Sequence, residues 1–223
     1  MTTVFDALHP ALKAAVEGRG WSPTPVQDLA LPALASGDEG VVVAPTGSGK
    51  TMAAVLPLLH RCLDEAWEPL AILYVTPLRA LNRDVDRRLI DLAESVGLRV
   101  GLRHGDTSQS ERQRQVKRPP HLLVTTPETF QLMFTGHRLR ALLRTVQAVV
   151  VDEVHDLAAS ERGWQLSVGL SRLDHLCGRH VQRIGLSATV GNPTDVAEWL
   201  APGRGKAMVA VAPRETELTV ESE

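Results

Sequence analysis

The chain has 223 residues, of which 43% are hydrophobic and 22% charged, and its formal net charge is −2. This is the composition of an ordinary globular domain. No apolar run approaches the roughly 18 residues of a membrane span, and the N-terminus lacks the basic region and apolar block of a secretory signal. The two cysteines, Cys62 and Cys177, have no metal-like spacing, so we expect reduced thiols in a cytoplasmic protein.

The charge is unevenly distributed along the chain. Residues 79–144 carry 13 Lys and Arg against 7 Asp and Glu, a balance of +6; the whole chain has 24 against 26, so the remainder has a balance of −8. A basic middle is compatible with contacts to a phosphate backbone, although solvated helix surfaces give the same count. Aromatic residues make up only 4% of the chain, which argues against base stacking as the main mode of any nucleic-acid contact.

Six short apolar runs predict buried strands, and helical patterns lie between them. The runs are rich in Val, Ile and Leu and do not alternate strictly, as expected when both faces of a sheet are covered. The predicted strands are 40–44, 70–76, 98–103, 121–125, 146–152 and 183–187, and the clearest predicted helices are 51–65, 78–96 and 163–177. This order predicts an α/β fold with a mostly parallel sheet and helices on both faces. Residues 201–206 predict a linker, and 207–223 a strand-like exit.

A phosphate-binding loop is predicted where the first strand meets the first of these helices. Residues 44–51 read Ala-Pro-Thr-Gly-Ser-Gly-Lys-Thr. Gly47 and Gly49 let the backbone curl so that its N–H groups point at phosphate oxygens, and the following helix adds a positive field. Lys50 is predicted to reach the β- and γ-phosphates of ATP, and Thr51 to bind Mg²⁺. The predicted nucleotide-binding residues of the loop are Thr46, Gly47, Ser48, Gly49, Lys50 and Thr51.

An acidic pair is predicted to complete the nucleotide site. Asp152 and Glu153 stand at the end of the apolar run Ala-Val-Val-Val. The Asp152 carboxylate can hold Mg²⁺, and Glu153 can orient or deprotonate the attacking water. Phosphoryl transfer needs positioning and charge neutralisation more than covalent chemistry. The predicted catalytic residues are therefore Lys50, Asp152 and Glu153, with Thr51 and Asp152 as the metal ligands.

In this order the motifs resemble the first RecA-like domain of a superfamily 2 helicase across nearly the whole chain. Residues 21–27 (Trp-Ser-Pro-Thr-Pro-Val-Gln), with Phe5 upstream, resemble the Q motif, which implies that Gln27 hydrogen-bonds the adenine edge of ATP. The run Ser187-Ala188-Thr189 resembles the motif that couples hydrolysis to domain movement, with His155 as its partner. The resemblance implies that Ser187, Thr189 and His155 act as coupling residues.

The same resemblance implies a domain division. Residues 1–205 are expected to form a single RecA-like P-loop domain, and 206–223 to begin a linker toward a second RecA-like domain. Helicases of this superfamily close the nucleotide between two such domains, and the second supplies arginines to the developing phosphate charge. The resemblance therefore implies that ATP hydrolysis needs the second domain.

Three loops at strand ends resemble the strand-gripping motifs of the family. They are 76–83, 105–108 and 125–128, and the implied contact residues are Pro77, Arg79, Asn82, Arg83, Gly105, Asp106, Thr126, Pro127 and Glu128. Backbone N–H groups, hydroxyls and Arg side chains at helix starts suit phosphates and do not read sequence. Helix capping is the alternative, since Thr126 followed by Pro127 is a good helix start by itself. A basic run that is equally compatible with a solvated face consists of Arg112, Arg114, Lys117 and Arg118.

Details of the motifs resemble one group within the superfamily. Asp-Glu-Val-His replaces Asp-Glu-Ala-Asp, and Pro127-Glu128 replaces Pro-Gly-Arg, both of which point away from the RNA-unwinding DEAD-box group. The runs 104–108, 118–120 and 126–128, together with Arg162-Gly163, resemble the large helicase-related (Lhr) group. That resemblance implies ATP-driven translocation along single-stranded DNA with 3′-to-5′ unwinding. The choice of DNA over RNA rests on the analogy alone.

Two other functions remain open on the sequence. A nucleotide-dependent clamp that binds strands with little turnover would not need the water-positioning Glu153. A P-loop kinase or transporter ATPase is not expected to have Gln27 or the run 187–189, and no Leu-Ser-Gly-Gly-Gln-type signature is present. The expected cofactors are ATP and Mg²⁺. The expected partners are single-stranded nucleic acid, with DNA favoured over RNA, and a second RecA-like domain of the same polypeptide; no membrane is expected.

Overall fold

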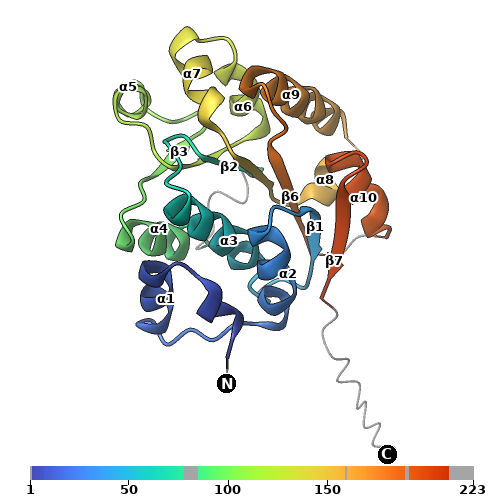
Figure 1. Cartoon of the computed structure of the whole chain (residues 1–223). Helices are drawn as coiled ribbons and strands as arrows, with labels where there is room; N and C mark the ends of the chain where they lie inside the picture. Colours follow the sequence, from blue (N-terminus) through green and yellow to red (C-terminus); the bar gives the residue numbers. More distant parts are fainter. Residues whose placement is uncertain (1, 78–84, 159, 189–190, 211–223) are drawn as a thin grey trace, which may run out of the picture.

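A parallel β-sheet runs through the centre of the protein (Figure 1). The computed structural model of the chain describes residues 2–77, 85–158, 160–188 and 191–210. Their sheet has seven strands in the order β3-β4-β2-β5-β6-β1-β7, and each neighbouring pair is parallel. The strands are β1 (Glu39–Val43), β2 (Ile72–Val75), β3 (Val100–Arg103), β4 (Leu122–Thr125), β5 (Ala148–Val151), β6 (Gln182–Ser187) and β7 (Gly205–Val209).

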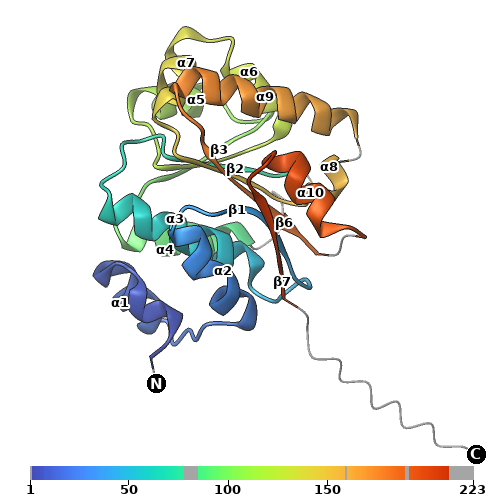
Figure 2. The ribbon, with the colours of Figure 1, turned by 45° about the vertical axis from the view of Figure 1, so that its right-hand side comes forward.

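Both faces of the sheet are buried, and strand residues alternate between two apolar cores. In β2, Ile72 and Tyr74 belong to one core, whereas Leu73 and Val75 belong to the other. The first core is built with α1 (Pro10–Glu17), α2 (Pro25–Ala35), α3 (Lys50–Asp64) and α4 (Val85–Ser95), and the second with α6 (Pro127–Met133), α8 (Val154–Ala158), α9 (Glu161–Cys177) and α10 (Pro193–Leu200). Figure 2 shows the sheet between these two layers. Two-sided burial explains why the strands read as continuous apolar runs.

The shorter helices complete the chain. The helix α5 (Gln109–Lys117) connects β3 to β4, and α7 (His137–Leu142) follows α6; the two helices are in contact at the β3 end of the sheet (Figure 1). Single turns of 3-10 helix occur at η1 (Val4–Ala7) and η2 (Leu143–Thr145).

The predicted α/β fold with helices on both faces is confirmed, and each of the six predicted strands lies within two residues of an observed one. The predicted helices 51–65 and 163–177 correspond to α3 and α9. The helix α9 begins earlier than predicted because the Ser160 side chain accepts a hydrogen bond from the Gly163 N–H at 3.2 Å and caps it. Of the predicted helix 78–96, α4 is observed, and residues 78–84 lie outside the described part of the chain.

The C-terminal boundary predicted from the sequence falls within an observed strand. A division between residues 205 and 206 falls inside β7, which pairs in parallel with β1 and extends the sheet to Val209. Gly40 makes this pairing possible, because a Cβ at that position would lie 1.8 Å from the carbonyl oxygen of Lys206. The sequence predicts a linker over 201–206 and a strand-like exit from 207, so it misses the start of β7, because Gly205 and Lys206 belong to no apolar run.

No helix in the described ranges is long and apolar enough to cross a membrane. Both cysteines are free thiols, and burial raises the pKa of the Cys62 thiol to about 11. This thiol is therefore protonated near neutral pH and unreactive as a nucleophile.

Candidate functional site

The predicted functional residues follow the carboxyl ends of the strands, and the parallel sheet brings those ends to one side. We call this side the carboxyl edge, formed by residues 44–51 after β1, 76–77 after β2, 104–108 after β3, 126–128 after β4, 152–155 after β5 and 187–188 at the end of β6. Register supports the proximity, since Val43 is paired with Ser187 and the Ala44 N–H donates to the Ser187 carbonyl at 3.2 Å. Ligands of open parallel sheets bind outside such an edge.

The loop between β1 and α3 has the backbone that phosphate binding requires. Gly47 and Gly49 have φ angles of +78° and +93°, in the left-handed region that favours glycine. The Ser48 hydroxyl donates to the Pro45 carbonyl at 2.7 Å, which closes the turn from inside. Gly49 is the N-cap of α3, so the amino end of a 15-residue helix and its unpaired N–H groups face the loop.

Lys50 lies at the base of this loop. Its ammonium donates to the Ala44 carbonyl at 2.7 Å. Burial lowers the pKa of Lys50, while the nearby charges of Glu153 and Asp152 act in the opposite direction. The lysine of β1's loop and the acidic pair of β5 are thus electrostatically coupled across the carboxyl edge.

The Asp152 carboxylate is held at both oxygens. Its Oδ2 accepts a hydrogen bond from the Tyr74 hydroxyl at 2.8 Å, and its Oδ1 accepts one from the Glu153 N–H at 2.9 Å. Glu153 has a φ angle of +48°, which is uncommon for a residue with a side chain. This turn directs the chain away from the strand directly after Asp152 and leaves the Glu153 side chain 34% exposed.

Tyr74 was not among the predicted site residues, although it is the only tyrosine in the chain. It lies in the middle of β2 and is 2% exposed, where an apolar residue is expected. A buried hydroxyl needs a hydrogen-bond partner, so a lone tyrosine within a buried strand was an available signal.

The predicted coupling residues meet where β5 and β6 end. The Ser187 Oγ and the His155 Nδ1 are 3.0 Å apart, and the His155 Nε2 lies 3.6 Å from the Glu153 Oε2. His155 therefore connects the acidic pair with the end of β6. Thr189 lies outside the described residues.

The Gln27 side chain connects the start of α2 with the predicted phosphate-binding loop. It is 6% exposed; its Oε1 accepts from the Thr24 N–H at 3.1 Å, and its Nε2 donates to the Gly49 carbonyl at 3.3 Å. A Cβ on Gly49 would lie 2.7 Å from that Nε2. A side-chain amide can make up to about four hydrogen bonds, so these two leave it capacity for a base. Its link to Gly49 was not predicted.

The loops predicted to grip nucleic acid are described only in part. Pro77 is partly buried after β2, while Arg79, Asn82 and Arg83 lie outside the described residues. Gly105 and Asp106 are exposed in the loop after β3. This loop is held by Arg112, whose guanidinium donates to the carbonyls of His104, Gly105 and Thr107 at 2.8–2.9 Å.

At the third loop, capping is confirmed for Thr126. The side chain of this buried residue accepts from the Thr129 N–H at 3.3 Å, and Pro127 occupies the first turn of α6. Glu128 is exposed and forms an ion pair with Arg162 of α9 at 2.7 Å. Sequence analysis named Arg162 only as part of a resemblance and did not predict this link between α6 and α9.

A parallel α/β sheet with a glycine-rich loop and lysine after one strand and an acidic pair after another defines a P-loop nucleotide-binding domain. Comparison with known proteins then gives the family. The DEAD/DEAH box helicase family matches residues 24–196, and the chain belongs to that family. Membership excludes the kinase and transporter alternatives and confirms the predicted superfamily 2 RecA-like fold.

Relatives with similar sequences carry Lhr names, as the motifs predicted. The chain is 45% identical over 195 residues to the Lhr helicase/probable uracil glycosylase of Mycolicibacterium smegmatis, covering 81% of this chain and 13% of the relative. It is 41% identical over 197 residues to the ATP-dependent helicase Lhr-Core of Sulfolobus acidocaldarius, covering 82% and 22%. The solved structure of Mycobacterium smegmatis helicase Lhr bound to ssDNA and AMP-PNP matches 95% of this chain and 28% of that chain, with a TM-score of 0.82 and 38% identity. The chain thus spans well under a third of each.

Proposed function

We propose that this chain is the ATP-binding motor domain of an ATP-dependent helicase or translocase that acts on single-stranded nucleic acid, with DNA preferred over RNA. The observation that carries the proposal is the geometry of the carboxyl edge, where a glycine loop with positive φ angles leads into Lys50 at the start of α3 and the Asp152 carboxylate is held after β5. The relative solved with ssDNA and AMP-PNP supports both ligands.

The residues present fit a nucleotide with Mg²⁺. Gly47 and Gly49 put no side chain in the way of a phosphate, so the loop N–H groups can donate hydrogen bonds to phosphate oxygens, and Lys50 adds a positive charge. The Thr51 hydroxyl and the Asp152 carboxylate are oxygen donors of the kind that Mg²⁺ prefers. When bound, the ion neutralises charge on the phosphates. The alignment of Asp152 by Tyr74 fixes one of these donors in advance.

We assign the remaining steps to residues of this chain. Glu153 orients the attacking water and accepts its proton. His155 bridges Glu153 and Ser187, so a change at the acidic pair reaches the end of β6. The presence of Glu153, a partly exposed carboxylate that an inert clamp would not need, favours a turning-over motor. Gln27 contacts the adenine edge while it holds Gly49.

Single-stranded nucleic acid is proposed to cross the carboxyl edge at the β2 to β4 loops, through Pro77, Gly105, Asp106 and the 126–128 turn, together with Arg79, Asn82 and Arg83. Residues beyond β7 are proposed to lead to a second RecA-like domain, which the greater length of the relatives supports. A cytoplasmic location stays a prediction of the sequence.

The nucleotide assignment is tested by titrating a fluorescent ATP analogue with Mg²⁺. Lys50→Ala removes the charge but leaves the loop backbone, and we expect affinity to fall about tenfold to a hundredfold, the effect of losing hydrogen bonds to a charged group. Lys13→Ala is the control, because Lys13 pairs with Asp6 on the exposed surface of α1. Equal affinity of wild type and Lys50→Ala would remove the basis for the assignment.

A further inference from the structure

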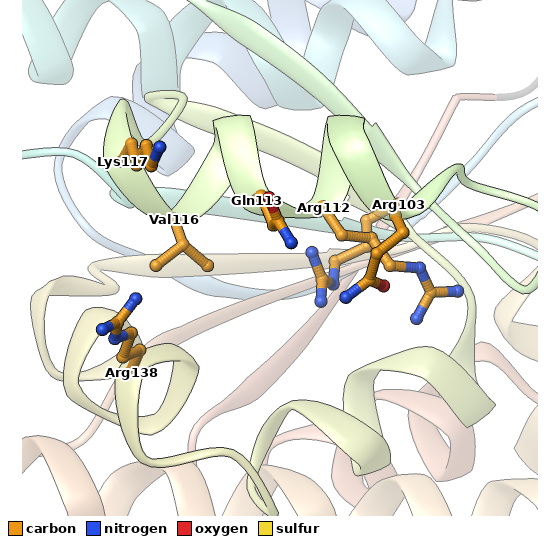
Figure 3. A pocket seen from close by; sticks show the side chains of 7 residues that line it. Arg103, Arg112, Gln113, Val116, Lys117 and Arg138 are labelled. Atoms are coloured by element: carbon orange, nitrogen blue, oxygen red, sulfur yellow. The ribbon is translucent and has the colours of Figure 1, made fainter.

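A basic cavity lies between α5 and α7, away from the nucleotide loop. Its volume is about 470 Å³. Four of its seven lining residues are cationic and none is acidic; the cations are Arg103, Arg112, Lys117 and Arg138. Figure 3 shows the side chains of α5 on one side of the cavity and Arg138 of α7 on the other. We call it the α5–α7 cavity.

Arg103 is the unusual member of this group. It is 6% exposed, and its Nη1 donates to the Gln115 Oε1 at 3.2 Å. Within the described ranges it has no ion pair with a carboxylate. Burial lowers the pKa of Arg103, and the charge of Arg112 lowers it further. A guanidinium stays charged in proteins, and a buried charge is costly unless it is paired. The site is therefore electrostatically incomplete without an anion.

The acidic residue of α5, a helix that the structure describes throughout, forms no ion pair with Arg103. Glu111 of α5 pairs with the exposed Arg114 at 2.8 Å and accepts from the Gln115 amide at 3.1 Å. Arg112 has its guanidinium engaged with backbone carbonyls, which satisfy its hydrogen bonds but leave its charge in place. Lys117 and Arg138 are exposed at the rim.

The position of the cavity indicates what the anion belongs to. Arg112 lines the cavity and also holds the loop of Gly105, so the wall of the cavity continues into the carboxyl edge. Arg103 ends β3 and is paired in register with Thr125, directly before the 126–128 turn. A strand crossing the β3 and β4 loops would have its backbone beside the mouth of the cavity.

We propose that the α5–α7 cavity binds a phosphate group, and that this phosphate belongs to the backbone of the bound nucleic-acid strand, which rests on the proposed function. Arg103 supplies the buried charge, and Lys117 and Arg138 add positive charge from the rim at the other end of the cavity (Figure 3). Arginine and lysine are suited to this contact, which carries no sequence information. The cavity would extend the nucleic-acid-binding surface beyond the loops that resemble the family's motifs.

The test compares two double variants by fluorescence anisotropy with a labelled single-stranded DNA at several salt concentrations. Lys117→Gln with Arg138→Gln removes two lining cations. Arg114→Gln with Arg140→Gln removes two exposed cations from the same helices, neither of which lines the cavity. The net-charge change is identical. We expect about a tenfold loss of affinity for the lining pair only. Its log–log salt slope should fall by about 0.7, the value for one phosphate contact on a single strand.

Other results would overturn the proposal. Equal losses for both pairs would indicate a general positive field, and no loss for the lining pair would exclude a phosphate contact. Calorimetric binding of inorganic pyrophosphate that the lining pair abolishes, with DNA affinity unchanged, would make the cavity a site for a small free anion. Absence of DNA binding by the wild type would instead overturn the proposed function, and the strand assignment with it.

Arg103→Met provides a second measurement, because the two side chains are similar in length. Burying an unpaired charge is costly, and an apolar side chain at the same position removes that cost. We therefore expect a thermal midpoint at or above that of the wild type, together with weaker DNA binding. A lower midpoint with unchanged DNA affinity would show that Arg103 serves only the fold.

Discussion

At the nucleotide end of the carboxyl edge, Lys50 and Asp152 already have hydrogen-bond partners within the domain, whereas at the β3 end Arg103 is buried in a cavity without a carboxylate. The first region holds its charges in fixed positions through Ala44 and Tyr74. The second leaves positive charge uncompensated. Fixed charges suit a reaction whose geometry must be reproduced at every turnover. An uncompensated basic surface suits a ligand that must bind, slide and leave.

The largest effect is expected at the nucleotide end, which is proposed to need a group from a second RecA-like domain. We expect the chain alone to release phosphate from ATP slowly, about 10³–10⁵ below a two-domain enzyme, because that is the contribution of an arginine finger. Steady-state phosphate release, with and without single-stranded DNA, measures it. Strong DNA-stimulated turnover would contradict this, unless specific activity rises with protein concentration, which would mean that a second copy supplies the arginine.

The next effect concerns Gln27, which belongs to the fixed region. We expect ATP to compete roughly tenfold to a hundredfold better than GTP for a fluorescent analogue, because guanine mismatches the amide at a cost of about 1–3 kcal/mol. Gln27→Leu should abolish this preference. Tripolyphosphate affinity should also fall, since Gln27 holds Gly49. Unchanged tripolyphosphate affinity would limit Gln27 to the base, and equal competition by GTP in the wild type would show that it does not read adenine.

Tyr74→Phe tests whether the alignment of Asp152 matters. The change removes the hydroxyl that donates to the Asp152 Oδ2 and keeps the ring in the first core. We expect about tenfold more Mg²⁺ to be needed for analogue binding, as is usual when a partner of a metal ligand is lost. Thermal unfolding of the same variant serves as the control for packing. An unchanged Mg²⁺ requirement would mean that Asp152 is positioned without Tyr74.

The smallest effect is expected at the surface pair of Glu128 and Arg162, which joins α6 to α9. Both side chains are about half exposed, at 54% and 48%, so solvent screens their attraction. We expect Arg162→Ala to lower the free energy of unfolding by about 0.2–1 kcal/mol, less at high salt. A double-mutant cycle with Glu128→Gln, followed by chemical denaturation, measures the coupling. A coupling energy several times larger would show that this ion pair is a strong contact, like the hydrogen bonds that hold Lys50 and Asp152, and not a weak surface pair.

Much of the fold was predictable because local pattern decides it. The Val-rich runs form strands, and Gly47 and Gly49 occupy the left-handed positions that a phosphate loop needs. The start of β7 was not predictable, since most of the strand's residues are partly or fully exposed and its first residues become a strand only by pairing with β1 at Gly40. Edge strands carry weak sequence signals for this reason.

In the candidate site, too, some features follow from the sequence alone and others only from the tertiary structure. The sequence by itself determined which residue types follow each strand, including Lys50, Asp152 and Glu153, because these are continuous motifs read within one short stretch. Only the tertiary structure decided that Tyr74 holds Asp152 and that Gln27 holds Gly49, and that Arg138 of α7 faces the cations of α5. These contacts join residues far apart in the chain, and their geometry depends on sheet register and helix packing. Motifs record local backbone and chemistry, whereas the balance of charge in a cavity is a property of the folded arrangement.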